Sequence, residues 1–171
     1  ARLVGELNAL NGRWPGVTVN VGTFEGGTRS NVIAERASML IDVRSPEGVT
    51  LDEAEAEIER ICSRPSDPDI RIEAIGRRWH RPMEKSEASQ RLVDTARKVA
   101  AEIGFDLVDS LTGGASDACT TSAAGVPTLD GLGPIGGGDH SPVEFLDLTS
   151  IVPRLSLLGG LIARVAEQGG V

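Results

Sequence analysis

Two stretches of alternating apolar residues constrain the fold of this chain more than any other feature of its sequence. The first is a run of valines, and the second ends an extended segment that begins at Val32; the apolar positions are Val17, Val19, Val21, Met39, Ile41 and Val43. Successive side chains of a strand point to opposite faces, so each stretch predicts a strand with one buried face. The glycines of Glu25-Gly26-Gly27-Thr28 separate the two strands.

Two helices and one further strand accompany these strands within residues 1–79. The first helix ends at the stop signal Asn11-Gly12, and the second opens at a capping box formed by Thr50 and Glu53. Ile70 and Ile72 predict the further strand. The apolar faces of the helices are Leu3, Val4, Leu7 and Leu10 in the first, and Leu51, Ala54, Ile58 and Ile61 in the second. This order predicts an α+β domain, an antiparallel sheet with both helices on one face.

The pattern changes after a connector at Trp79–Glu84, and residues 80–171 predict a second domain. Helices and short strands alternate there, which is typical of an α/β layer with a parallel sheet. The predicted strands cover 105–111 and 126–132, and helices stop at Gly104 and Gly125. The last helix has an apolar face at spacings of four and three residues, formed by Ile151, Leu155, Leu158, Ile162 and Val165.

Composition excludes several classes of function. A net charge of −8 leaves no basic surplus for nucleic-acid phosphates. No apolar run approaches the ~18 residues that a membrane span needs, so we expect no membrane partner. Cys62 and Cys119 lie in predicted helices far apart in the sequence, and we expect both to be buried and reduced, as in a cytoplasmic protein. The first helix lacks a capping residue and the chain does not begin with Met, so we expect a part of a longer protein.

The glycine-rich stretch from Leu132 to Glu144 carries the most chemistry, because it ends in His140. Gly131-Leu-Gly133-Pro-Ile-Gly136 matches a dinucleotide-binding pattern, but such a site needs a helix directly after the glycines, and Pro142 opposes one. His140 alone predicts a structural or hydrogen-bonding histidine. It becomes a metal ligand only if other ligands come from elsewhere, because a catalytic zinc takes about three protein ligands.

The other candidate side chains leave alternatives open. Ser116 precedes a helix and is first a helix cap, although a nucleophile would use the same residue type. Arg44 ends an apolar run, where it is either a solvated charge or a bidentate clamp for a substrate carboxylate. The second histidine, His80, is expected at the surface or in a hinge.

Five ordered segments resemble the M20 metallopeptidases, in the carboxypeptidase G2-like branch and its relatives that deacylate amino acids. The segments are Gly22–Ala34, Ile41–Arg44, Gly113–Asp117, Gly125–Gly133 and Gly137–Phe145. The resemblance implies a lid or dimerisation domain over 1–79, lacking its first strand, and the C-terminal part of a two-zinc catalytic domain over 80–171. It also implies a homodimer through the lid domain.

The same resemblance assigns the site residues. His140 is implied as a zinc ligand, Asn31 and Arg44 as lid residues that hold the substrate carboxylate and reach a neighbouring subunit's site, and Gly114 as a backbone contact to substrate. The implied reaction is attack of a zinc-bound hydroxide on an amide next to a free carboxylate, in a peptide or N-acyl amino acid, releasing an amino acid such as glutamate.

The family's remaining site residues have no counterpart in this chain. A His-x-Asp ligand motif, a bridging aspartate, the general base and the lid histidine are all absent, so we expect the catalytic base before residue 1. We therefore expect the full-length protein to be an enzyme and this chain alone to be inactive. The alternative is a non-catalytic dimerisation or interaction module derived from the same family.

Overall fold

The computed structural model describes residues 1–65, 67–76, 78 and 80–170 and divides the chain into two compact units. The first unit is Ala1–Glu84 and the second is Lys85–Val171. The division falls five residues after the sequence-based boundary between 79 and 80. Trp79, with which the expected connector begins, lies outside the described residues.

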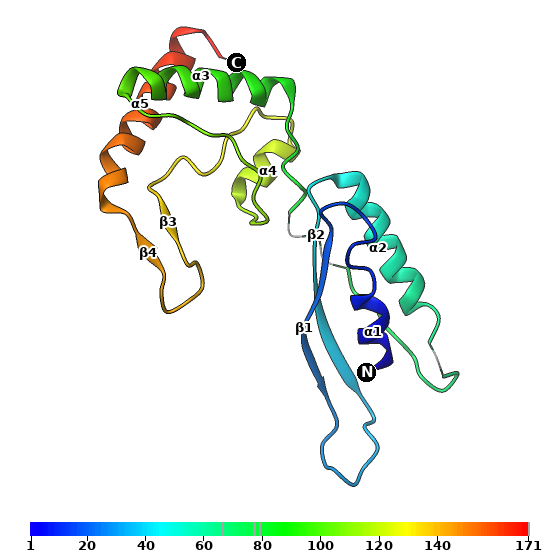
Figure 1. Ribbon diagram of the computed structural model, residues 1–171. Coiled ribbons are helices and arrows are strands. Elements are labelled where there is room, and N and C mark those ends of the chain that lie inside the picture. Colours follow the sequence, from blue (N-terminus) through cyan, green and yellow to red (C-terminus); the bar gives the residue numbers. More distant parts are fainter. Residues whose placement is uncertain (66, 77, 79, 171) are drawn as a thin grey trace. The chain divides into compact units, whose positions relative to one another are not determined.

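The first unit is built on an antiparallel hairpin (Figure 1). Strand β1 (Thr18–Gly26) pairs with β2 (Ala37–Arg44), with Val19 opposite Val43 and Gly26 opposite Ala37. A bulge between Val21 and Thr23 shifts the register by one residue. The two alternating stretches of the sequence are therefore the two paired strands, as predicted.

Helices α1 (Arg2–Asn8) and α2 (Gly48–Cys62) supply the other half of this unit's core. The core is formed by buried side chains from both helices, from β1 and from the segment between α1 and β1, which are Leu7, Leu10, Val17, Val19, Ala54 and Ile61. Val21, Met39, Ile41 and Val43 pack against it. This unit therefore combines an antiparallel hairpin with helices, which agrees with the predicted α+β class.

The start of α2 differs from the prediction. Thr50 does not cap the helix: its hydroxyl lies 2.6 Å from the Ser45 hydroxyl, and α2 begins earlier, at Gly48. The backbone N–H of Gly48 instead donates to a carboxylate oxygen of Glu84 at 2.6 Å. A capping group 36 residues away replaces the local one, which no sequence pattern near Thr50 could indicate.

The strand predicted at Ile70–Ile72 does not form. Residues 70–76 are described without any strand pairing, and Ile70 and Ile75 are exposed. A strand is stable only when a neighbour takes up its backbone hydrogen bonds, and the described residues offer this segment no ladder.

The second unit is dominated by two long helices. Helix α3 (Glu87–Ile103) begins at Ser86, whose hydroxyl accepts from the Ser89 N–H, and ends at the left-handed Gly104. It packs on α5 (Ile151–Glu167), which follows the short 3₁₀ helix η1 (Leu148–Ser150). Their shared core consists of Ala96, Val99, Ala100, Leu157 and Leu161. In the sequence, α3 and α5 are separated by α4 (Asp117–Ala123) and by a short antiparallel hairpin, formed by β3 (Gly136–Gly137) and β4 (Phe145–Leu146).

The expected parallel sheet of this unit is wrong for the described residues. Residues 105–111 and 126–132 pair with no strand, and the only ladder there joins β3 to β4 in antiparallel fashion. Phe105, Leu107 and Leu129 nevertheless pack against the helical core, as the apolar pattern required. Burial of these side chains was predictable, whereas pairing needs neighbouring strands that the described residues do not provide.

The buried face of helix α5 overlaps only partly with the predicted one, since Val165 packs against the core as predicted. Leu157 is fully buried and Leu161 is 6% exposed, whereas Leu155 and Ile162 are both 62% exposed. The segment Leu148–Glu167 is long and apolar enough to span a membrane by length and composition, which corrects the expectation that no such run exists. Its packing on α3 through Leu157 and Leu161 accounts for part of this apolar character, as for a core helix of a globular unit.

Candidate functional site

His140 lies in the turn of the short hairpin of the second unit. The N–H of Ser141 donates to the carbonyl of Gly138 at 3.1 Å and closes the turn, and the Ser141 hydroxyl donates to the same carbonyl at 2.6 Å. His140 has a φ of 63°, which makes it the one residue other than glycine with positive φ among those described. The imidazole is exposed, on a backbone conformation that L-residues seldom adopt.

The glycines before His140 are explained by close packing within this hairpin. A Cβ atom at Gly136 would lie 2.8 Å from the carbonyl oxygen of Phe145, and one at Gly138 would lie 2.9 Å from that of Val143. A Cβ at Gly137 would lie 2.9 Å from the Phe145 ring. The run therefore lets two backbone segments approach each other, and it opens strand β3 where a dinucleotide site would need a helix.

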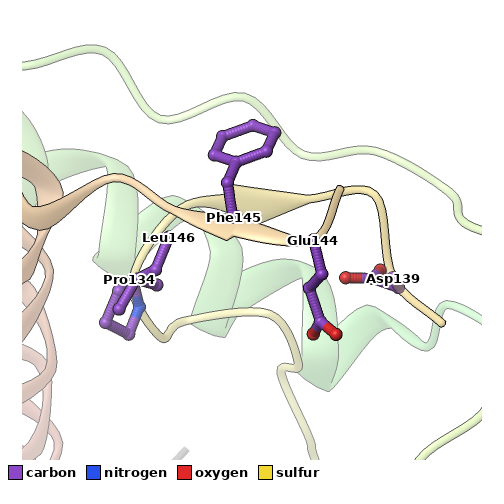
Figure 2. Close-up of a pocket in the computed structure, with 6 residues that line it drawn as sticks. Pro134, Asp139, Glu144, Phe145 and Leu146 are labelled. Atoms are coloured by element: carbon purple, nitrogen blue, oxygen red, sulfur yellow. The ribbon is translucent and has the colours of Figure 1, made fainter. Parts of the chain in front are cut away.

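Two carboxylates share this hairpin with His140. Asp139 and Glu144 line an open hollow together with Pro134, Gly136, Phe145 and Leu146. Figure 2 shows the Glu144 carboxylate on one side of the hairpin and the Phe145 ring on the other. Among the described residues, however, no three His, Cys, Asp or Glu side chains are grouped so that they could hold a metal ion. The hairpin presents one imidazole and does not form a complete metal site.

Gly114 precedes helix α4 in an irregular, exposed loop. A Cβ at Gly114 would meet nothing closer than the Thr112 hydroxyl oxygen, at 3.9 Å, and the backbone there is not left-handed. Neither packing nor φ explains this glycine within the chain, unlike the glycines at 136–138. Close approach of another group to the backbone remains a physical reason for it.

Ser116 is the cap of α4, as the sequence predicted. Its hydroxyl oxygen accepts from the Ala118 N–H at 3.1 Å and its hydroxyl donates to a carboxylate oxygen of Asp130 at 2.6 Å. Asp130 also accepts from the Gly131 N–H at 2.7 Å. Sequence reasoning missed Asp130, which ties the loop after Gly114 to the segment that leads to His140.

Asn31 and Arg44 belong to the first unit and lie at opposite ends of its hairpin. Arg44 is the last residue of β2, opposite Thr18, whereas Asn31 lies in the connection between the strands, beyond the final pair of Gly26 and Ala37 (Figure 1). At about 3.3 Å per residue, the seven steps from Ala37 to Arg44 span about 23 Å. The structure therefore does not bring these two predicted substrate residues together.

Arg44 is exposed and bound to a carboxylate of its own strand. Its Nε lies 2.7 Å from a carboxylate oxygen of Asp42, and the side chains of Arg44 and Asp42 are 58% and 55% exposed. The second histidine of the chain, His80, is half-buried in the irregular segment before Glu84. Cys62 and Cys119 are both free and buried, as expected, and burial raises the pKa of the Cys62 thiol.

Comparison with known proteins places this chain in a family. Residues 1–69 match the family model of the M20 peptidase dimerisation domain. The chain belongs to the M20 peptidase family. Carboxypeptidase G2 of Pseudomonas sp. (strain RS-16) is 31% identical over 140 residues, which cover 81% of this chain and 34% of that protein.

Two further proteins are similar to this chain. N-carbamoyl-L-amino-acid amidohydrolase of Rhizobium meliloti is 28% identical over 135 residues, covering 76% of the M20 chain and 31% of that protein. The crystal structure of aminopeptidase PepT from Bacillus cereus superposes with a TM-score of 0.62 and 19% identity, over 95% of this chain and 44% of that one. This last likeness concerns the fold alone. The M20 chain spans about a third of the length of carboxypeptidase G2 and of the N-carbamoyl-L-amino-acid amidohydrolase.

Proposed function

We propose that the full-length protein is a metal-dependent amidohydrolase or exopeptidase that cleaves an amide next to a free carboxylate. The observation that carries this proposal is the similarity to carboxypeptidase G2, which extends over 81% of the chain and so includes both units. The resemblance to an N-carbamoyl amino-acid amidohydrolase supports the same class of bond. The substrate would be a small peptide or an N-acyl amino acid, and one product an amino acid such as glutamate.

Arg44 would recognise the substrate carboxylate. A guanidinium binds a carboxylate through two parallel N–H donors, and Arg44 already uses its Nε toward the carboxylate of Asp42. More than half of the Arg44 side chain is exposed, so an incoming carboxylate has access to it.

Asn31 would act in a different site from the Arg44 of its own chain. The two residues are separated by the length of strand β2, so one substrate carboxylate cannot contact both within a single copy. In a homodimer, each site would take Asn31 from one copy and Arg44 from the other. This proposal differs from the sequence-based expectation, which assigned both residues to the same neighbouring site.

A homodimer through the first unit is supported by the dimerisation-domain match and by apolar surface on the hairpin. The exposed apolar side chains on β1, β2 and their connection are Phe24, Val32, Ile33 and Leu40, with Ile33 95% exposed. Apolar surface of this kind marks interaction sites when it is grouped. The dimer would cover part of it.

His140 would supply one ligand to a metal centre, and Gly114 would offer backbone groups to the substrate. The described residues do not complete that centre, so its other ligands and the general base would come from residues outside this chain. We expect two zinc ions in the full-length enzyme. Imidazole and carboxylate ligands bind several metals, so cobalt or manganese could take the place of zinc. The chain by itself would be inactive.

The protein would be cytoplasmic, which agrees with the free thiols of Cys62 and Cys119.

The test uses the full-length protein, purified with zinc and assayed on a panel of N-acyl amino acids and dipeptides. We expect hydrolysis that is lost on chelation and restored by zinc, and His140→Gly should lower the zinc content while the protein stays folded. Glycine is the suitable replacement because the φ of residue 140 is positive. A zinc-loaded protein that hydrolyses none of these substrates would instead support the non-catalytic dimerisation module.

A further inference from the structure

Three consecutive residues at the junction of the two units are each fixed to a different group. Glu84, the last residue of the first unit, accepts from the Gly48 N–H at 2.6 Å and so holds the first residue of helix α2. A carboxylate at this position also interacts favourably with the positive end of the helix dipole. Glu84 is thereby attached to the first unit.

The next two residues are attached to the second unit. Lys85 forms an ion pair between its Nζ and the carboxylate of Asp109. Ser86 caps helix α3, accepting from the Ser89 N–H at 3.0 Å. The change from one unit to the other therefore occurs within one peptide link, after Glu84 and before Lys85.

Arg78, a few residues before Glu84, is also bound to the first unit. The Arg78 guanidinium binds two carboxylates of helix α2, with an Nη2 to Asp52 distance of 2.6 Å and an Nε to Glu55 distance of 3.2 Å. These pairs raise the pKa of Arg78, chiefly through the hydrogen bond to Glu55. Pro82 fixes its own φ, and the side chains of Pro82 and Met83 are half-buried.

We propose that, at this junction, the pivot between the two units is confined to the Glu84–Lys85 link, with Glu84 and Lys85 as its two anchors. Relative motion would then be taken up mainly by ψ of Glu84 and φ of Lys85. A connector that is free over its whole length would instead distribute the motion over several residues. This inference concerns the covalent junction alone and does not depend on the proposed enzymatic activity.

The experiment measures the distribution of distances between the units in the full-length protein. Spin labels are attached through Glu59→Cys on α2 and Ala101→Cys on α3, both exposed positions, in a background with Cys62→Ala and Cys119→Ala. Hydrogen exchange of the Gly48 amide reports on the Glu84 anchor directly. We expect Glu84→Ala to widen the distance distribution and to speed Gly48 exchange roughly five- to tenfold. Lys85→Met should widen the distribution without affecting Gly48.

Two controls separate the anchors from general effects of charge. Glu84→Gln keeps an acceptor oxygen and should leave both measurements close to those of the parent protein. Glu47→Ala removes the same charge one residue from Gly48, at a side chain that makes no capping bond to α2, and should widen nothing. The proposal is overturned if Glu84→Ala and Lys85→Met leave the width unchanged, or if Gly48 exchange does not respond to Glu84→Ala.

Discussion

The side-chain amide of Asn11 binds both backbone groups of Val19. Its Nδ2 donates to the Val19 carbonyl at 2.6 Å, and its Oδ1 accepts from the Val19 N–H at 2.9 Å. Val19 lies opposite Val43 in the hairpin. Because its N–H and carbonyl both bind Asn11, these backbone groups face away from β2. Asn11 thus occupies the position of a neighbouring strand and closes the edge of β1 at this point. Unpaired edges of this kind otherwise invite association with another chain.

Replacing Asn11 should therefore destabilise the first unit. Asn11→Ala removes two hydrogen bonds at a partly buried edge, which are worth about 1–2 kcal/mol together. Urea denaturation, monitored by far-UV circular dichroism, measures the change in unfolding free energy. Asn8→Ala is the control, because only the backbone carbonyl of Asn8 meets the Asn11 side chain. Equal stability of the Asn8 and Asn11 variants would contradict this role.

Glu57 should make stability depend on pH in the acid range. Arg60 and Arg13 hydrogen-bond to its carboxylate and lower its pKa from 4.5 to about 2. A lowered pKa means that the folded state favours the charged form, so the stabilisation is complete above pH 4.5 and is lost as the pH falls toward 2.

The matching measurement is unfolding free energy between pH 6 and about 2.5 in Glu57→Gln and in the parent protein. The variant should show a shallower decline in stability over this range, and added salt should narrow the difference. Glu59→Gln, at an exposed position on the same helix, serves as the charge-matched control. A parent-like pH profile in Glu57→Gln would show that the two arginines do not act through this carboxylate.

Two adjacent glycines of α5 should respond oppositely to alanine. A Cβ at Gly160 would lie 2.7 Å from Cγ1 of Val99 on α3, whereas a Cβ at Gly159 meets nothing within 4 Å. Gly159→Ala should therefore stabilise the second unit by roughly 0.5–1 kcal/mol through helix propensity. Gly160→Ala should destabilise it by about 1–3 kcal/mol, because β-branched Val99 has little rotamer freedom. Thermal unfolding distinguishes them, and adding Val99→Ala should rescue Gly160→Ala.

The positions of Asn31 and Arg44 predict complementation between inactive subunits. Asn31→Ala and Arg44→Ala should each impair the proposed hydrolysis in the full-length protein. If each site takes the two residues from different copies, mixed dimers contain one intact site, and re-assorted mixtures should recover about a quarter of the parent activity. Mixtures that stay as inactive as the separate variants would show that both residues serve from one copy.

Local features of the sequence were sufficient for much of the fold. The alternation around Val19 and Ile41 predicted the hairpin and its buried face, and Gly104 and Ser116 marked helix ends correctly. These signals succeed because side-chain direction in a strand and capping at a helix end depend on residues a few positions apart. The family resemblance came from the same kind of information, since its segments are short and contiguous.

Tertiary structure decided what depends on distant partners. The cap of α2 comes from Glu84 and not from Thr50, the edge of β1 is closed by Asn11, and α5 buries Leu157 in place of Leu155. The predicted strands at 70–72, 105–111 and 126–132 have the right apolar pattern but no ladder among the described residues. Likewise the sequence identified Asn31 and Arg44 as candidate substrate residues, and only the register of β1 and β2 places them at opposite ends of one hairpin. A pattern fixes which side chains avoid water, whereas hydrogen bonds and helix contacts depend on which segments meet in space.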